Sequence, residues 1–203
     1  SREDKFIYIK NVELEARLFS YDKDFFGSSD WSIRQAASIG RERGGIKVYA
    51  DKFRVFGYGL KGDDWLRLDY DRSRSINKLD DEVNDFIEDP NDRPGLRIFR
   101  NASLFGHVTF KKECNSLLEI TINRERLIEN EAFDELRHFA RIGIDFSTVI
   151  YSNLVYKKQK EKREKLVRER EELAKAEEEA IRKAKEERAR AEEEIVRAQE
   201  QKD

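Results

Sequence analysis

The fold of this chain is decided at residues 46–59, which read IKVYADKFRVFGYG. Two runs rich in β-branched and aromatic residues flank Asp51-Lys52, and such residues favour strands because they pack well on a pleated surface. Two strands joined by two residues are typical of a β-hairpin. Asp-Lys lacks the glycine that tolerates positive φ in such a turn, so the turn register stays open. We expect a hairpin here.

Further strands are expected on both sides of the hairpin. Residues 12–18 alternate between apolar and charged side chains, which predicts a strand with one buried face. Residues 6–9 are expected to extend this strand or to form a separate edge. Two more β-rich runs predict strands at 104–110 and 117–122. The chain therefore has enough strands for a small sheet.

Helices are expected before and after these strands. Residues 31–43 predict a short helix that Gly44-Gly45 ends. Residues 71–95 contain both prolines and many acidic and amide side chains, so we expect a long irregular connection with about one helical turn.

A longer helix is predicted from Asn130 onward. Asn130 suits an N-cap, and Glu131 and Asp134 lie in the first turn, where the helix dipole favours negative charge. The face expected to be buried comprises Phe133, Leu136, Ala140, Ile144, Ser147, Ile150 and Leu154. An adjoining apolar stripe comprises Phe139, Ile142, Phe146 and Val149. A helix with so wide an apolar surface is covered on more than one side.

The last part of the chain has a separate composition, which divides the sequence into residues 1–156 and 157–203. The second part has 16 basic and 15 acidic residues among 47, and no proline or glycine follows Gly143. Glutamates precede a basic residue by four positions at residues 161, 164, 171, 178, 179, 186 and 193. Such pairs stabilise a helix by about 0.2–0.5 kcal/mol each. We expect a charged helical arm.

Whether this arm is a coiled coil or a solvated single helix is left open by the pattern. Val167, Ala174, Ile181 and Ile195 keep a seven-residue spacing, but Arg188 interrupts the row. The matching second core positions are Arg170, Glu177, Ala184, Ala191 and Ala198. Ion pairs alone can stiffen a single helix.

Composition excludes several classes of protein. The 203 residues carry a net charge of −2, one cysteine and two histidines, which disfavours a stand-alone nucleic-acid binder, a disulfide framework and a cysteine- or histidine-rich metal site. No run of 18 apolar residues and no signal-peptide pattern is present. We expect an intracellular, reducing compartment and no membrane partner. The absence of methionine and the start at Ser1 suggest a piece of a longer protein.

Two local patterns resemble ligand sites but have simpler interpretations. Residues 57–62, GYGLKG, match G-x-G-x-x-G, yet a dinucleotide site needs a helix to begin there. Two aspartates follow instead, so we favour a glycine-bearing loop. The aspartates at 63, 64, 69 and 71 lack the spacing of a calcium loop, and no metal site is expected. No nucleophile–base pair stands out around His107, His138 or Cys114, so this segment is expected to be inactive alone.

Two stretches resemble the second, or transducer, domain of GHKL-type ATPases, a family that groups gyrase, histidine kinases, the heat-shock chaperone ATPase and MutL. They are residues 44–69, GGIKVYADKFRVFGYGLKGDDWLRLD, and residues 105–133, where ITINRERLIENEAF follows a strand. The resemblance covers most of residues 5–150. It implies an α+β fold of the ribosomal-protein-S-five type, a mixed sheet backed by helices, followed by the long charged helix.

The resemblance also implies a function and a site. In that family the transducer loop offers a cation to the γ-phosphate of ATP bound with Mg²⁺ in a preceding domain. Arg124 occupies the matching position and Asn123 precedes it, so Arg124 is the expected catalytic residue and both are expected nucleotide contacts. The ATP-binding domain itself, with its Asp-x-Gly-x-Gly motif, is absent from these residues. The implied partners are that domain, a second copy of the parent in a homodimer and, as in MORC-type proteins, DNA.

Three departures separate this chain from the family pattern. Asp51-Lys52 replaces the usual Asp-Gly, Arg126 replaces the glycine after Asn-Arg-Glu, and the connection at 71–95 is longer than usual.

Two other functions remain open. The first is a protein-interaction or dimerisation module with a charged helical arm and no nucleotide. The second is RNA binding, which calls for exposed aromatics on a basic face. Phe6, Tyr8, Phe53 and Phe56 lie in strand patterns, so we expect them in the core.

Overall fold

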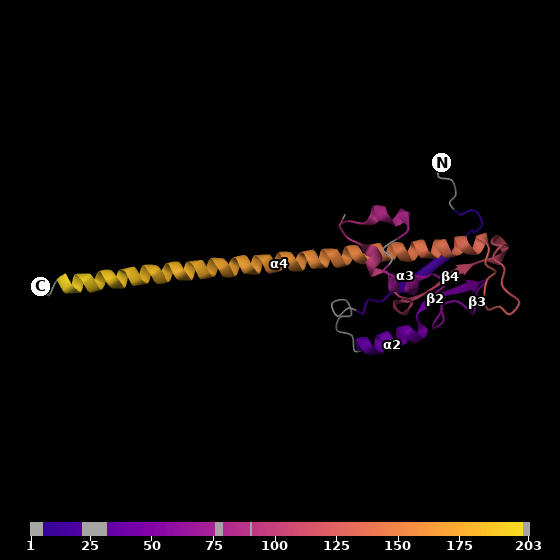
Figure 1. The fold of residues 1–203 in the computed structure, drawn as a ribbon, viewed down its shortest axis with the longest axis horizontal. Helices are drawn as coiled ribbons and strands as arrows, with labels where there is room; N and C mark the ends of the chain where they lie inside the picture. The colour runs from indigo at the N-terminus through magenta and orange to yellow at the C-terminus, as the bar shows by residue number, and fades with distance from the viewer. Residues whose placement is uncertain (1–5, 22–31, 76–78, 90, 201–203) are drawn as a thin grey trace. The chain divides into compact units, whose positions relative to one another are not determined.

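The computed structural model describes residues 6–21, 32–75, 79–89 and 91–200, with only the backbone from residue 189 onward. These residues form two units, 1–153 and 154–203. The first is an α+β unit with a mixed four-stranded sheet, as predicted, and Figure 1 shows its helices on the two sides of the sheet.

The sheet has the order β1-β4-β2-β3. Its strands are β1 (Glu13–Leu18), β2 (Gly45–Ala50), β3 (Phe53–Val55) and β4 (Leu104–Phe110). β1 pairs antiparallel with β4, β4 pairs parallel with β2, and β2 pairs antiparallel with β3. The strands expected at 12–18 and 104–110 are confirmed. The parallel pair joins β2, which ends at Ala50, to β4, which begins 54 residues later at Leu104. Sequence periodicity could not reveal this pairing.

The hairpin at 46–59 is confirmed, and its turn has two residues. Asp51 and Lys52 both have positive φ, 49° and 72°, the combination that matches the twist of the flanking strands. Asp51 is held there because its backbone N–H donates to the Phe110 carbonyl (3.0 Å) and its carboxylate accepts from the Lys112 N–H (3.0 Å). Tertiary hydrogen bonds therefore replace the glycine that the turn lacks.

Helix α2 (Ile33–Arg43) confirms the predicted short helix. Ser32 and Gln35 form a reciprocal capping box at its start, and Gly44 ends it. Helix α4 (Glu131–Glu200) begins as predicted, with the Asn130 side chain accepting from the Phe133 N–H (3.0 Å). Within the first unit, α4 packs on the sheet at Gly143, where a Cβ atom would collide with the Leu14 side chain.

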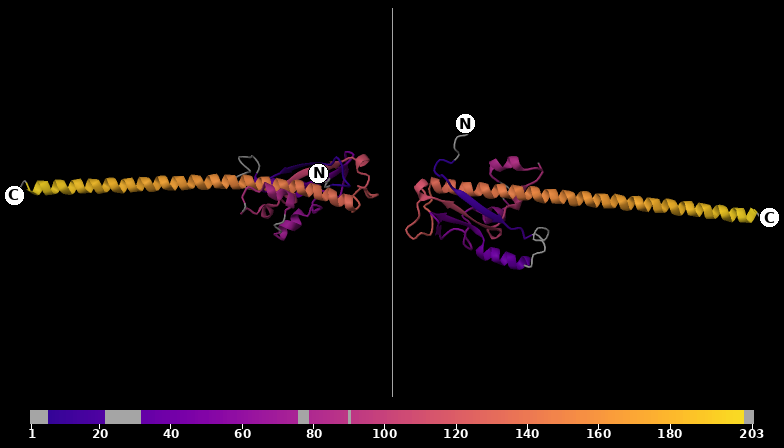
Figure 2. Two further views of the ribbon diagram at one scale, coloured as in Figure 1. Left: turned by 90° about the horizontal axis from the view of Figure 1, so that it is seen from above. Right: turned by 180° about the vertical axis from the view of Figure 1, so that it is seen from behind.

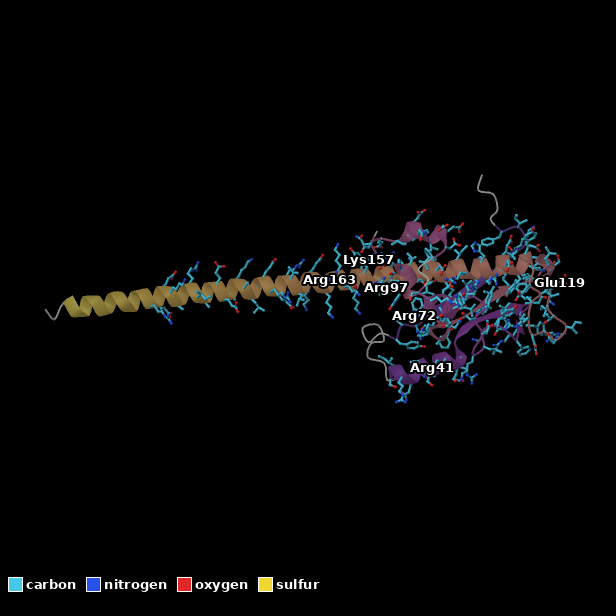
Figure 3. The ribbon with its side chains drawn as sticks, in the orientation of Figure 1. Arg41, Arg72, Arg97, Glu119, Lys157 and Arg163 are labelled. Carbon is cyan, nitrogen blue, oxygen red and sulfur yellow. The ribbon has the colours of Figure 1, made fainter. Side chains whose placement is uncertain are left out.

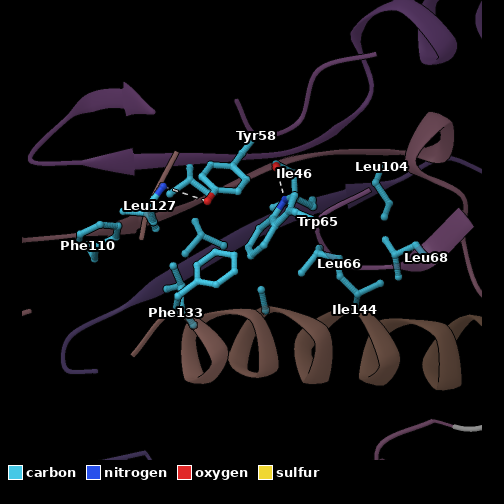
Figure 4. Close-up of a cluster of buried hydrophobic side chains, with 14 of the residues drawn as sticks. Ile46, Tyr58, Trp65, Leu66, Leu68, Leu104, Phe110, Leu127, Phe133 and Ile144 are labelled. Carbon is cyan, nitrogen blue, oxygen red and sulfur yellow. Dashed lines mark hydrogen bonds between the residues drawn. The ribbon is translucent and has the colours of Figure 1, made fainter. Parts of the chain in front are cut away.

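The core lies between the sheet and the first turns of α4 (Figure 4). Tyr58, Trp65 and Phe133 pack against one another with ring centroids 5.4 to 6.3 Å apart. The Trp65 indole donates to the Ile46 carbonyl (2.9 Å), which satisfies its buried N–H. This cluster joins the residues after the hairpin to β2 and α4.

The prediction of a strand at 117–122 is wrong. Residues 115–118 form a turn instead, and only an isolated bridge, Ile120 to Leu127, remains. The cause is Asn115, which is buried and whose side chain bonds the backbone of Lys10 and Lys111. These bonds bend the chain where the apolar pattern suggested a straight strand.

The strand expected at 6–9 is also absent from the structure. The backbone N–H groups of Ile7, Tyr8 and Ile9 donate to the Glu135 carboxylate at 2.8 to 3.2 Å. A side chain on α4 therefore supplies the acceptors that a neighbouring strand would have supplied.

The buried face of α4 differs from the predicted one beyond Ile144. Ile150 and Leu154 are exposed and Ser147 is half-buried, whereas Asp145, Thr148, Ser152 and Asn153 are buried. The irregular connection explains the difference, because it packs on this side of the helix through polar bonds. Asn153 bonds the backbone of Phe86 and Glu88, Asp145 accepts from the Asp80 N–H, and Ser152 bonds Asp92 and Arg97.

The connection holds more helix than the single turn expected from its sequence. It contains the end of α3 (Leu68–Ser73) and the 3-10 helices η1 (Asp81–Phe86) and η2 (Pro94–Arg97), with η3 (Asn101–Ser103) just before β4 and η4 (Lys112–Cys114) after it. Arg141 on α4 anchors this segment by bonding Asp145, Asp71 and the Leu66 carbonyl at 2.6 to 3.0 Å.

The second unit is the remainder of α4. Figure 3 shows side chains projecting from both sides of its helix, and those of residues 157–188 are exposed. Ion pairs such as Lys183–Glu179 (2.9 Å) join side chains four residues apart, so the predicted long C-terminal helix is confirmed. Figure 2 gives two further views of the ribbon. Across the described parts of the chain, no helix has the length and apolarity needed to span a membrane.

Candidate functional site

The candidate site is the turn at residues 121–126, which carries Arg124. The Arg124 N–H donates to the Thr121 carbonyl (2.8 Å), and the Arg126 carbonyl accepts from the Thr121 N–H (2.9 Å). Arg124 has φ 57°, a conformation that residues other than glycine, asparagine and aspartate rarely adopt. Its exposed side chain makes no hydrogen bond or ion pair with any described residue.

Asn123 shapes this turn. Its side-chain oxygen accepts from the Thr121 hydroxyl (2.7 Å) and the Glu125 N–H (3.2 Å), and its amide nitrogen donates to the Glu125 carboxylate (2.8 Å). These bonds use the polar atoms of Asn123 within the turn itself. Asn123 therefore holds the geometry of the turn that carries the exposed Arg124.

The turn is docked on residues 56–58, which directly follow β3. The N–H groups of Phe56 and Gly57 donate to the carbonyls of Arg124 (3.3 Å) and Glu125 (2.6 Å). The Leu127 N–H donates to the Tyr58 hydroxyl (3.0 Å) in the buried core, a bond that is drawn in Figure 4. The two stretches that carry the family resemblance thus form one bonded unit.

Glycine is required at two positions in this unit. A Cβ atom on Gly57 would collide with the Glu125 carbonyl and the Arg126 side chain. Gly59 has φ +66°, and its Cβ would lie 2.7 Å from the Ile46 carbonyl oxygen. The GYGLKG pattern therefore serves close backbone approach in a loop, as the simpler interpretation predicted.

Asp63 and Arg126 join the turn to the same loop. One Asp63 oxygen accepts from the Gly59 N–H (2.8 Å), and the other lies 3.5 Å from the Arg126 guanidinium. Arg126 also lies over the Tyr58 ring, 5.5 Å from its centroid. Burial raises the pKa of the Asp63 carboxyl, while the Gly59 amide and Arg126 act in the opposite direction.

A groove of about 410 Å³ lies beside Arg124. Its walls come from the β2–β3 hairpin, from Lys112 after β4 and from the turn at residues 120–124. Cationic and apolar side chains both line it. The groove and the Arg124 turn together form the candidate site.

Three aromatic side chains expected in the core are on the surface. Phe53, Phe56 and Tyr8 are 75%, 60% and 41% exposed, whereas Phe6 is half-buried against Phe139. Phe53 lines the groove and Ile122 of the turn is fully exposed. β3 of the hairpin is an edge strand of the sheet, so aromatic residues in its sequence need not all be buried in the core.

The other sequence candidates have structural partners. Asp64 accepts from the N–H groups of Leu68, Asp69 and Tyr70 and so begins α3, while Asp71 pairs with Arg141. His138 lies 3.5 Å from Asp80, and His107 packs edge-on against Tyr49. No group of three metal-ligating side chains converges within the described residues.

Sequence reasoning missed the residues that position the turn: Gly57, Tyr58, Asp63 and Arg126. The sequence pattern places Tyr58 only in the hairpin and Asp63 only among the aspartates at 63–71. The glycines at 57 and 59 were the available signal, because glycine often marks a close backbone approach.

Comparisons of this chain with protein families, with curated proteins and with solved structures find no match to any of them. The candidate site therefore rests on its own geometry.

Proposed function

We propose that this chain is the transducer part of a GHKL-type ATPase, with a fold of the ribosomal-protein-S-five type. In this proposal Arg124 contacts the γ-phosphate of ATP that a preceding domain holds with Mg²⁺. The observation that carries the proposal is the Arg124 turn: a rigidly supported loop presents an exposed guanidinium that has no partner among the described residues.

The support for the turn suits such a role. Transfer of a terminal phosphoryl group concentrates negative charge on its oxygens, and a guanidinium placed in advance stabilises that charge. The turn is held by four backbone hydrogen bonds, two within it and two from the N–H groups of Phe56 and Gly57. A fifth bond joins the Leu127 N–H to the Tyr58 hydroxyl. A positive φ at Arg124 is a strained conformation, and such strain clusters at functional sites.

The test is ATP turnover by the polypeptide that contains the ATP-binding domain and these residues. Arg124→Ala is expected to lower turnover on the order of 10²–10³-fold, with an unchanged melting temperature because Arg124 is exposed. Arg17→Ala is a matched control, since Arg17 is an exposed arginine on β1 paired only with Glu15 in the described structure. Equal turnover in the wild type and Arg124→Ala would refute the role of Arg124.

The proposal also requires an ATP-binding domain encoded ahead of Ser1. An asparagine-bearing helix followed by Asp-x-Gly-x-Gly in the upstream coding sequence would support it. A start codon directly before Ser1 would overturn the nucleotide function and leave the interaction module.

The charged helix is proposed to relay the nucleotide state and to form a dimer arm. Leu166, Val167, Leu173 and Ile181 are exposed on the isolated helix, and pairing with a second copy would bury them in a coiled coil. Sedimentation of the wild type and of Ile181→Lys tests this, because Ile181 lies on the seven-residue row and a dimer through that row should dissociate in the variant. The link to DNA remains part of the proposal, although the net charge of the arm is close to zero.

The alternative function is a protein-interaction module without a nucleotide. The exposed apolar side chains of Phe53, Phe56 and Ile122 favour it, because they surround the Arg124 turn and would be buried by a partner. Under the alternative, Phe53→Ser abolishes partner binding while ATP has no effect. Under the transducer proposal, the same variant lowers ATP turnover.

A further inference from the structure

A cluster of cationic and aromatic side chains lies on the sheet face opposite α4. Ile46 and Val48 of β2 point into the core, so Lys47 and Tyr49 between them point to the other face. Arg54 is directly opposite Tyr49 in the β2–β3 pair, and His107 is directly opposite Lys47 in the β4–β2 pair. These four side chains therefore share one face of three neighbouring strands.

The two cations of this cluster have few partners. Lys47 donates to the Arg43 carbonyl (3.1 Å), and one terminal nitrogen of Arg54 donates weakly to the Tyr58 carbonyl (3.4 Å). The Arg54 Nε atom is buried and has no hydrogen-bond partner in the described structure. Neither side chain has a carboxylate partner among the residues described.

Such an arrangement is unfavourable without a ligand. Partial burial, and secondarily the charge of Arg54, lowers the pKa of Lys47, because an ammonium that loses part of its hydration is destabilised and a nearby cation repels it. A buried donor without a partner also costs free energy. The acidic residues of this face, Glu13 and Glu15, lie on β1 at the far side of β4, and Glu15 bonds Arg17.

We propose that Lys47 and Arg54 bind the phosphoryl group of a phosphate monoester on this face of the sheet. A phosphate monoester carries a charge of about −1.5 to −2 at neutral pH, which balances two cations. Its oxygens can accept from the Lys47 ammonium and from the unpartnered Arg54 Nε–H. Tyr49 and His107, whose ring centroids are 5.7 Å apart, provide an aromatic surface beside it for the organic part of the ligand.

This site adjoins the Arg124 groove, because Arg54 also lines that groove, but it does not rest on the proposed ATPase function. Lys47, on the central strand β2, is not among the described residues that line the groove, and it separates the two sites. The proposal can therefore be tested on these 203 residues alone.

The experiment is a titration with inorganic phosphate at constant ionic strength, followed by the NMR signal of the Arg54 Nε–H group. We expect a saturable shift with a dissociation constant on the order of 1 mM, typical of a small anion held by few contacts. Calorimetry should show binding at least about tenfold weaker in Arg54→Gln and in Lys47→Gln, since each variant loses a charged hydrogen bond. Arg17→Gln, an exposed arginine on the same face, is the matched control and should bind as the wild type does.

Three results would overturn the proposal. The first is no saturable shift in the wild type. The second is equal phosphate affinity in the wild type and both glutamine variants. The third is loss of binding in Arg124→Gln but not in Lys47→Gln, because phosphate would then occupy the groove, whose described lining lacks Lys47. Lys47→Gln keeps the proposal testable if Arg54→Gln fails to fold.

Discussion

The bond between the Tyr58 hydroxyl and the Leu127 N–H provides a sharp test of how the Arg124 turn is held. Both residues are almost completely buried, and the bond is 3.0 Å long. Tyr58→Phe removes the hydroxyl and keeps the ring that packs on Trp65 and Phe133. The substitution therefore isolates one polar contact between the two resemblance-bearing stretches.

The expected magnitude follows from the fate of the Leu127 N–H. In Tyr58→Phe this donor stays buried without an acceptor, which costs about 1–3 kcal/mol. We expect a loss of about 2 kcal/mol in the free energy of unfolding, which lowers the melting temperature of a unit of this size by about 4–8 °C.

The assay is urea denaturation followed by tryptophan fluorescence, because Trp65 is buried against Tyr58. Hydrogen exchange at the Leu127 amide gives a local measure and should become faster. Tyr70→Phe is the matched control, since the partly exposed Tyr70 hydroxyl bonds no described residue, and it should change stability by less than about 0.5 kcal/mol. If Tyr58→Phe is as stable as this control and Leu127 exchange is unchanged, the bond does not hold the turn.

Three further predictions concern stability. Arg141→Met leaves the carboxylates of Asp145 and Asp71 without their cation and should lower the free energy of unfolding by about 3–5 kcal/mol. Adding Asp145→Leu should recover only part of this loss in the same urea assay, because Asp71 stays unpaired and the Asp80 N–H loses its acceptor. Burial alone would raise the pKa of Asp92, but hydrogen bonds from a serine and an arginine outweigh it and hold the pKa below its usual range. This stabilisation is therefore present above about pH 3.9 and is lost as the pH falls through the lowered pKa, so Asp92→Asn should show a shallower decline in stability between about pH 4 and pH 2. Gly57→Ala should loosen the Arg124 turn by steric collision, seen as faster amide exchange at Glu125, and unchanged exchange would show that the backbone relaxes freely.

Local patterns predicted most of the secondary structure. The hairpin at 46–59, the strand at 104–110, the helix capped by Ser32 and the helix that begins after Asn130 all have signals within a few residues of one another. Their hydrophobic period and caps depend on neighbouring residues only. The two strand predictions at 6–9 and 117–122 failed for the same kind of reason. In each place a polar side chain, Glu135 or Asn115, bonds a backbone group more than 100 residues away.

The candidate site could be predicted only in part. Arg124 was found through its resemblance to a family motif, but no local pattern shows that its turn is docked on Gly57 and Tyr58. Likewise, no local pattern shows that α4 buries the polar side chains of Asp145 and Ser152, because the connection that packs on them is far away in the sequence.

Local sequence patterns are therefore sufficient for the α+β class, the hairpin and the charged C-terminal helix, because periodicity, capping and charge pairing act over one or two turns of chain. The strand order, the support of the Arg124 turn and the placement of Lys47 and Arg54 on one face are visible only in the folded molecule. These depend on contacts between segments tens of residues apart, which are selected by packing and by the need to pair buried polar groups.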